Sequence, residues 1–332
     1  MLVRVEAWLP IPGLGSVNVY AFTDGVDTIL VDAGMYHARS FHTLLKGLRR
    51  SGVEPKSISR VIITHYHVDH LTGALLVAEA FGAEVYMGAR DVELVTGVGV
   101  EGYVKSALEL FRTSGVPSSV VEEIVRYHPG LRLIEAYKAV SELDIKPLRG
   151  DDMVEMPGLG VFTVVDAPGH TPGHIILVSG KEKVVIAGDT ILPGITPHVS
   201  LHTLDSDPLK DYIDTLEMIA SRLKGFKALP GHRTPIPDAA ARALELIEHH
   251  KSRLREVEDI VARLGSPTAF EVAVRVTWSG GRKWEDLTPP EKYFALAETL
   301  AHLKRLESLG RLEARWKSVK GLGTALTWTI TR

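Results

Sequence analysis

The sequence predicts an α/β protein of two domains, in which two sheets pack face to face with helices outside them and a small helical module follows. Strand-like segments lead and helix-like segments follow twice along the chain, which is the order that such a sandwich requires. A long helical stretch separates the two halves, and near residue 237 the strands give way to helices and a final hairpin. With 332 residues and 45% apolar content, the chain is long enough to bury more than one core.

The first half alternates strands with helices. Its expected strands are 3–10, 17–23, 27–34 and 59–64, and its expected helices are 38–50 and 71–82. The second and third strands are joined around DGVD, a hairpin turn signal, and Gly82 is expected to end the second helix.

A helical insert is expected at 89–143, with breaks at Gly115 and Pro117 and again at Pro129 and Gly130. Strand character then returns. The expected strands are 161–169, 174–180, 183–190 and 226–232, and a helix at 207–225 with Asp207 as its N-cap precedes the last of them.

The C-terminal quarter has a different pattern. A long helix is expected at 237–264, where Gly265 and Pro267 stop it. The remaining expected elements are a short helix within 266–278, a longer helix within 288–312 and a hairpin over 312–332 that turns at 321–323. Three helices and a terminal hairpin fit a winged-helix module.

The charge of the chain is unevenly distributed. Residues 249–332 hold 15 Lys and Arg against 10 Asp and Glu, a net +5, whereas residues 1–248 hold 23 against 31, a net −8. We therefore expect one domain at 1–248 and a basic, winged-helix-like domain at 249–332. The whole chain, at −3 and a pI near 6.5, gives no global sign of nucleic-acid binding.

Neither a membrane segment nor a signal peptide is recognisable. No run approaches the roughly 18 apolar residues of a membrane-spanning helix, and the N-terminus lacks a signal peptide's apolar region. A cytoplasmic protein that does not enter a membrane is expected. The chain has no Cys, no Gln and a single Asn, Asn18, and depletion of these thermolabile types predicts a thermophilic source. Without Cys, any metal must be held by His and carboxylate side chains.

One short stretch, RVIITHYHVDHLTGA at 60–74, is rich in metal-ligand side chains. His65, His67, Asp69 and His70 fall within six positions, directly after a run of β-branched residues. The first two histidines are two apart in an extended loop, which points both rings to one side, and the other two residues begin the next helix. Two ligand pairs can therefore face two adjacent metal ions.

Three later loops carry further ligand-type residues at expected strand ends. They are His170 in DAPGHTPGH, Asp189 in IAGDT and His232 in LPGHRTP. Each of these residues alone is more often a capping or packed residue than a ligand. Together the four loops offer five His and two Asp, the composition of a binuclear site, so the set predicts a metal centre.

The motifs THYHVDH, PGHTPGH, GDT and PGH resemble, in the same order, the metal motifs of the metallo-β-lactamase-fold metallohydrolase superfamily. Within it the chain is similar to the glyoxalase-II-like and lactonase-like group with a C-terminal winged-helix-like domain. The resemblance implies a four-layer αββα sandwich with the metals at one sheet edge. It also implies ligand roles: His65, His67 and His170 for the first ion, Asp69, His70 and His232 for the second, and Asp189 bridging.

A mechanism follows from two ions in such a site. Two such ions would supply a hydroxide at neutral pH, by lowering the pKa of a shared water toward about 7, for attack on a carbonyl or phosphoryl group. Asp69 is expected to be a ligand that also shuttles a proton, or a ligand only. His198, nine residues after Asp189, is expected to donate to the oxyanion, or else is a surface histidine. Asp32 is read either as an acceptor for a ligating imidazole or as a turn cap.

Supporting roles are expected for other residues. His174 is read as a packing or supporting residue rather than a ligand. The insert is expected to cap the site with apolar side chains, or else to pack them only on each other; they are Val92, Leu94, Leu108 and Phe111.

The predicted function is binuclear, zinc-dependent hydrolysis of a carbonyl ester, thioester or lactone in a small-molecule substrate. Iron and manganese remain alternative metals. Nucleic acid is the less favoured partner: a metal-dependent ribonuclease or phosphodiesterase would bind RNA through the basic domain, but Val68 stands where tRNA-maturation nucleases carry Gly. An iron-dependent persulfide dioxygenase is a further alternative, whereas His67 argues against a flavodiiron reductase, which has Glu there. The C-terminal domain is otherwise read as a packing module or as one that joins a homodimer.

Overall fold

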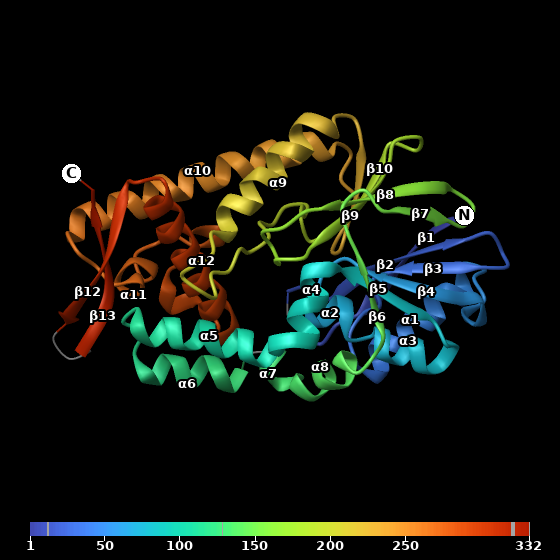
Figure 1. The fold of residues 1–332 in the computed structure, drawn as a ribbon, viewed down its shortest axis with the longest axis horizontal. Helices are drawn as coiled ribbons and strands as arrows, with labels where there is room; N and C mark the ends of the chain where they lie inside the picture. Colours follow the sequence, from blue (N-terminus) through green and yellow to red (C-terminus); the bar gives the residue numbers. More distant parts are fainter. Residues whose placement is uncertain (12, 128, 320–322, 332) are drawn as a thin grey trace. The chain divides into compact units, whose positions relative to one another are not determined.

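The computed structural model describes residues 1–11, 13–127, 129–319 and 323–331, which form two compact units (Figure 1). The sheet unit comprises 1–100, 133–197 and 215–244, and the helical unit comprises 101–132, 198–214 and 245–332. This division differs from the predicted one, because the helical unit takes in 101–132, 198–214 and 245–248 from the predicted first domain. The predicted boundary after residue 248 falls inside one continuous helix, α10 (Ala239–Leu264), and stays a prediction.

The first sheet of the sheet unit has six strands in sequence order. They are β1 (Leu2–Trp8), β2 (Ser16–Thr23), β3 (Thr28–Val31), β4 (Ile58–Ile63), β5 (Glu84–Gly88) and β6 (Ile145–Leu148). The first three pair antiparallel, and β2 and β3 form the predicted hairpin. From β3 to β6 the pairing is parallel, so helices provide the crossovers: α1 (Ala38–Arg50) connects β3 to β4, α3 (Ala74–Phe81) lies between β4 and β5, and the helical insert connects β5 to β6.

The second sheet has five strands in the order β11-β10-β9-β8-β7. They are β7 (Met153–Met156), β8 (Gly160–Asp166), β9 (Ile175–Ser179), β10 (Val184–Gly188) and β11 (Lys227–Pro230). The parallel pair of β10 and β11 is connected through α9 (Pro208–Arg222). The sequence pattern does not mark β5, β6 and β7, because each has only four or five residues and includes a charged one.

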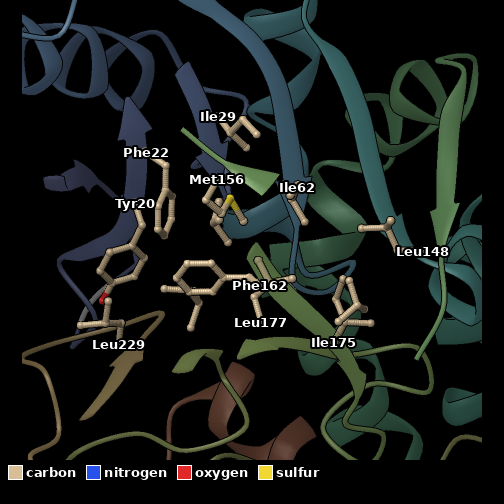
Figure 2. Packing of buried hydrophobic residues seen from close by; sticks show 13 residues of the cluster. Tyr20, Phe22, Ile29, Ile62, Leu148, Met156, Phe162, Ile175, Leu177 and Leu229 are labelled. Carbon is tan, nitrogen blue, oxygen red and sulfur yellow. The ribbon is translucent and has the colours of Figure 1, made fainter. Parts of the chain in front are cut away.

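The core of the sheet unit lies between the two sheets. Phe22 of β2 and Phe162 of β8 meet edge to face at 5.3 Å between ring centroids, and Ile62 and Leu177 pack in the same layer (Figure 2). All four residues of β3 are buried, as expected of a central strand with both faces covered. The predicted αββα sandwich is thereby confirmed.

The insert at 89–143 is helical, as the sequence predicts. It contains α4 (Ala89–Glu93), a π-helical turn (Leu94–Val98), α5 (Gly99–Thr113), α6 (Ser118–Tyr127), α7 (Pro129–Arg132) and α8 (Ile134–Ser141). Gly115 and Pro117 lie in the break between α5 and α6. Of the four proposed capping residues, Leu108 and Phe111 are buried in the helical unit, where the Phe111 ring lies 5.4 Å from that of Tyr293. A capping role for the insert stays a prediction.

The helical unit contains the predicted C-terminal helices and hairpin. After α10 come α11 (Ala269–Ala273), two short 3-10 turns, α12 (Pro289–Ser308), β12 (Leu312–Val319) and β13 (Gly323–Ile330). Thr268 and Thr288 each begin a helix with a capping box. The predicted turn at 321–323 falls largely outside the described residues, and the winged-helix name for this module stays a prediction. In the described parts of the chain, no helix is both long and apolar enough to cross a membrane.

A buried histidine pair joins α10 to α12 inside the helical unit. His250 Nδ1 donates to His302 Nε2 at 3.2 Å, and His302 Nδ1 donates to the carbonyl oxygen of Glu298 at 2.8 Å. Both imidazoles are fully buried and neutral in this arrangement. Burial lowers the pKa of His302 to about 3 and holds that of His250 well below its usual range.

This pair makes the stability of the chain depend on pH. The folded-state pKa of His302 lies below its ordinary value of 6.5, so the unfolded chain binds a proton that the folded chain excludes as the pH falls from about 6.5 to about 3. Between pH 7 and pH 5 this one group should remove about 2 kcal/mol of unfolding free energy. Urea unfolding of wild type and His302→Leu at both pH values measures it, since other titrating groups are common to both. An equal loss of stability in the two proteins would contradict the prediction.

Candidate metal centre

The predicted ligands all lie in the sheet unit, in loops that follow four of its strands. The loop after β4 leads through His65 and His67 into the short helix α2 (Val68–Leu71), which begins with Asp69 and His70 close to its N-terminus. His170 follows β8, Asp189 directly follows β10, and His232 follows β11. Residues that are far apart in the sequence therefore all lie in loops at the ends of strands.

The structure brings these seven side chains together in three overlapping groups. The groups are His65, His67 and His170; His65, His70 and Asp189; and Asp69, His70 and His232. In each group the donor atoms lie within 4.8 Å of one another. Six of the seven side chains are buried, and His67 is half-buried.

Distances between the donor atoms suit shared coordination of a cation. His65 Nε2 and His67 Nδ1 are 3.1 Å apart, close to the roughly 3.3 Å between two nitrogens that bind one tetrahedral ion. His232 Nε2 lies 3.3 Å from Asp69 Oδ2 and 3.5 Å from Asp189 Oδ2. His70 Nε2 lies 3.5 Å from Asp189 Oδ1, and among the described residues neither of these two buried atoms has a hydrogen-bond partner. Buried polar atoms without partners are costly, and a metal ion would satisfy them.

The buried carboxylates of the cluster favour positive charge beside them. Burial raises the pKa of Asp189, but His232 and His70 more than offset it and hold the pKa well below its usual range. Burial conversely lowers the pKa of His232, while Asp189 and Asp69 raise it to about 10. The carboxylates therefore draw cations into the site, as protons on the imidazoles or as metal ions. His65 differs, because burial and then the neighbouring imidazoles hold its pKa well below the usual range, so it is neutral and ready to ligate.

Groups around the cluster orient its imidazoles. Asp32 Oδ2 accepts from His70 Nδ1 at 2.8 Å, as one reading of the sequence predicts, and Asp32 also accepts from the backbone N–H of Thr64 at 2.9 Å. The backbone of Asp32 is left-handed, with φ of 63°, an uncommon conformation that is enriched at functional sites. His232 Nδ1 donates to the carbonyl oxygen of Ser16 at 2.8 Å. Both contacts direct Nε2 of the ring toward the cluster.

His174 supports the proposed bridging carboxylate. Its Nε2 accepts from the backbone N–H of Asp189 at 3.1 Å, and its Nδ1 lies 3.1 Å from Thr190 Oγ1. The ring also stacks on His65, with centroids 4.8 Å apart. The supporting role that the sequence predicts for His174 is thus consistent with its contacts.

His198 lies in the other unit. The loop that contains it belongs to the helical unit, where its ring packs against Phe294 with centroids 4.3 Å apart. It does not belong to any of the three ligand groups. Its role as an oxyanion donor stays a prediction.

Three residues that the sequence does not single out also belong to this region. Asp91 binds both loops that carry the first ion's predicted ligands. Gly231 leaves no room for a side chain, because a Cβ there would lie 2.3 Å from Asp189 Oδ1 and 2.6 Å from His70 Cε1. The pKa of buried Tyr137 on α8 is raised well above its usual range by burial, and further by Asp69 and Asp91. A single Asp, Gly or Tyr cannot be recognised as part of a site from the sequence alone. Gly231 has the one indirect signal, because it belongs to the PGH motif that contains His232.

Comparisons with known proteins agree with this geometry. The sequence profile of the Metallo-beta-lactamase superfamily matches residues 12–232, a span that includes all seven clustered residues. A Bacillus subtilis protein named "Probable metallo-hydrolase YqjP" is 24% identical over 328 residues, covering 93% of each chain. "Probable metallo-hydrolase MJ0888" of Methanocaldococcus jannaschii is 29% identical over 227 residues, covering 68% of this chain and 91% of its own.

A solved structure resembles the chain over its whole length. The metallo-beta-lactamase family protein TTHA1429 from Thermus thermophilus superposes with a TM-score of 0.78 at 26% identity, covering 99% of this chain and 98% of its own. The profile match spans well over half of the chain, and the cluster of His and Asp lies at the ends of strands in the corresponding sandwich. The chain therefore belongs to the metallo-beta-lactamase superfamily.

Proposed function

We propose that the chain is a binuclear, zinc-dependent hydrolase of carbonyl esters, thioesters or lactones. The observation that carries the proposal is the overlap of the three ligand groups, because His65 and His70 each belong to two of them. His65, His67 and His170 would hold one ion, and Asp69, His70 and His232 would hold the other. Asp189 lies between the two sets, with one oxygen 3.5 Å from His70 Nε2 and the other 3.8 Å from His170 Nε2.

The nature of the donors supports this choice of metal. All seven are imidazoles or carboxylates, which suit zinc and also accept iron or manganese. When bound, the ions supply Lewis acidity, so that water ionises at neutral pH and the carbonyl under attack is polarised. A dioxygenase with a single iron would leave the group of Asp69, His70 and His232 without a role.

The chain's own residues orient the site and handle protons. Asp32 and Ser16 fix the tautomers of His70 and His232 by accepting from their Nδ1 atoms. Burial raises the pKa of Asp69, but His70 and His232 outweigh it and lower the pKa below its usual value, so the carboxylate is ionised at neutral pH. Asp69 accepts the proton of the attacking water and passes it to the leaving group.

Charge pairing in the helical unit favours a small substrate over RNA. Many of the basic side chains in residues 249–332 form ion pairs with carboxylates of the same unit. These side chains are Arg253, Arg255, Arg282, Lys292, Lys304, Arg305, Arg311 and Arg315. Three of the partner carboxylates, Glu123, Asp207 and Glu248, lie outside residues 249–332 and offset part of that segment's net +5, which favours packing over phosphate binding.

A substrate panel on the full chain tests the proposal. A thioester, a lactone, p-nitrophenyl acetate, bis-p-nitrophenyl phosphate and a short RNA are offered to zinc-loaded protein, with metal content measured in parallel. We expect two zinc equivalents per chain and turnover of at least one carbonyl substrate that is lost on chelation and regained with zinc. Cleavage of RNA or the phosphodiester without turnover of any carbonyl substrate would contradict the proposal and support the nuclease alternative.

A further inference from the structure

Asp91 is a fully buried carboxylate that contacts both loops bearing the predicted ligands of the first ion. It lies on α4, directly after β5 of the first sheet. Its Oδ2 accepts from the backbone N–H of Tyr66 at 2.9 Å and from Thr171 Oγ1 at 2.7 Å, and its Oδ1 accepts from the backbone N–H of Gly173 at 2.6 Å. No predicted ligand is among these donors.

The groups that donate hydrogen bonds to Asp91 lie close in the sequence to the predicted ligands of the first ion. Tyr66 stands between His65 and His67 in the loop after β4, and Thr171 follows His170 in the loop after β8. The first loop extends from one sheet and the second loop from the other. The first ion's ligands therefore come from both sheets, and one carboxylate binds the backbone or side chain next to each ligand.

Close backbone contacts fix the same junction. A Cβ on Gly173 would lie 2.1 Å from the backbone nitrogen of Asp91, and a Cβ on Gly88 would lie 2.0 Å from the carbonyl oxygen of Gly173. Both positions therefore need glycine, and the second loop rests directly on the β5–α4 turn. The loop after β8 has little freedom to move while the hydrogen bonds to Asp91 are intact.

Metal binding is sensitive to this placement. Donor atoms must meet within a few tenths of an ångström to share one ion, and groups that orient ligands change metal affinity by about 10- to 100-fold. Hydrogen bonds to an ionised carboxylate are stronger than those between neutral groups. Three such bonds converge on Asp91, and none of the proposed catalytic steps uses this residue.

We infer that Asp91 is a positioning residue that sets the affinity of the first ion site by holding the His65–His67 loop and the His170 loop in register. The inference deepens the proposed function and rests on its assignment of ligands to two ions. It concerns metal affinity, so it can be measured whether or not a substrate has been found.

Two substitutions remove these contacts in different ways. Asp91→Asn keeps the size of the side chain but presents an N–H group to at least one of the three donors. Thr171→Val keeps the shape and removes one hydroxyl donor, and Thr171→Ser restores that donor. Asp207→Asn is the matched control, because Asp207 caps α9 and pairs with Arg305 in the helical unit.

Zinc affinity of each full chain is measured by competition with a chromophoric chelator, together with the absorption spectrum of the cobalt-loaded protein. We expect Asp91→Asn to weaken one of the two sites by about 10- to 100-fold and to alter the cobalt spectrum. Thr171→Val should weaken the same site, whereas Thr171→Ser and Asp207→Asn should match wild type. Thermal unfolding of the metal-free chains checks that the fold is retained.

Two results would overturn the inference. One is wild-type zinc affinity at both sites in Asp91→Asn and Thr171→Val. The other is equal weakening of both sites with a matching loss of stability in the metal-free chain, which would show a structural role only. If Asp91→Asn does not fold, the zinc affinities of Thr171→Val and Thr171→Ser are sufficient to test the inference. If the chain binds two zinc ions but turns over no substrate of the panel, the proposed function is rejected. The comparison of zinc affinities among the variants remains valid in that case.

Discussion

Asp189→Ala should lose most of its bound metal and at least about 10³-fold of its hydrolytic activity while the fold persists. The carboxylate lies between the two ligand sets, so its removal takes a donor from both ions at once. It also removes the negative charge beside His70 and His232. This charge is the strongest of those that raise the pKa of His232 and so favour a cation there. Loss of one preorganised electrostatic group in an active site commonly costs about 10² to 10³ in rate, and a bridging ligand should cost more.

Metal content by plasma mass spectrometry and turnover of the best panel substrate measure this effect. The exposed Asp144 provides the matched control, because Asp144→Ala makes the same chemical change in the sheet unit away from the ligand loops. Circular dichroism of both variants tests the fold, which should survive because the core between the sheets is independent of the ligands. Full activity in Asp189→Ala would reject the binuclear mechanism.

Gly231→Ala should abolish metal binding at one or both sites although it adds a single methyl group. A Cβ at this position would lie 2.3 Å from Asp189 Oδ1 and 2.6 Å from His70 Cε1, closer than any real contact. Two predicted ligands must therefore move, and each is held by buried partners: His70 by Asp32, and Asp189 by His174. We expect activity to fall by about 10²-fold or more, since displacement by about an ångström has that effect on active sites.

The control for this variant is Gly180→Ala. A Cβ on Gly180 meets nothing within 4 Å, so the same methyl group should leave metal content and activity unchanged. Zinc titration of both variants by calorimetry separates a loss of affinity from a loss of turnover. Wild-type zinc affinity in Gly231→Ala would mean that the ligand cluster relaxes easily and would refute the packing argument.

The sequence predicts well that the seven side chains lie close together, because the information is local. His65 and His67 are two residues apart in an extended loop, and Asp69 and His70 lie at the start of the helix that follows. Their spacing in the sequence is therefore enough to place these four side chains together. His170, Asp189 and His232 each follow a recognisable strand, and the ends of strands in a sandwich gather at a few edges. The αββα arrangement is predictable for a similar reason, since each half of the chain has strands before helices.

The parts that the sequence does not reveal depend on contacts between distant segments. Asp91 looks like an ordinary residue of a helical insert, and its role appears only when Tyr66 and Thr171 come to lie beside it. The composition of the helical unit is likewise hidden, because the contact of Phe111 with Tyr293 joins segments far apart in the chain. Periodicity identifies elements but does not show which of them pack together.

The origin of the ligands in both sheets has a thermodynamic consequence. An ion held by His67 and His170 would cross-link the two sheets in addition to their side-chain packing and to hydrogen bonds such as that from Ile175 N–H to the carbonyl oxygen of Thr64, so its binding free energy would become part of the folding free energy. At a free zinc concentration about 1,000 times the dissociation constant, one such ion adds about 4 kcal/mol to the stability. Under the proposed function, chelation would lower the stability of the chain, and the supply of metal would govern its resistance to proteolysis as well as its turnover.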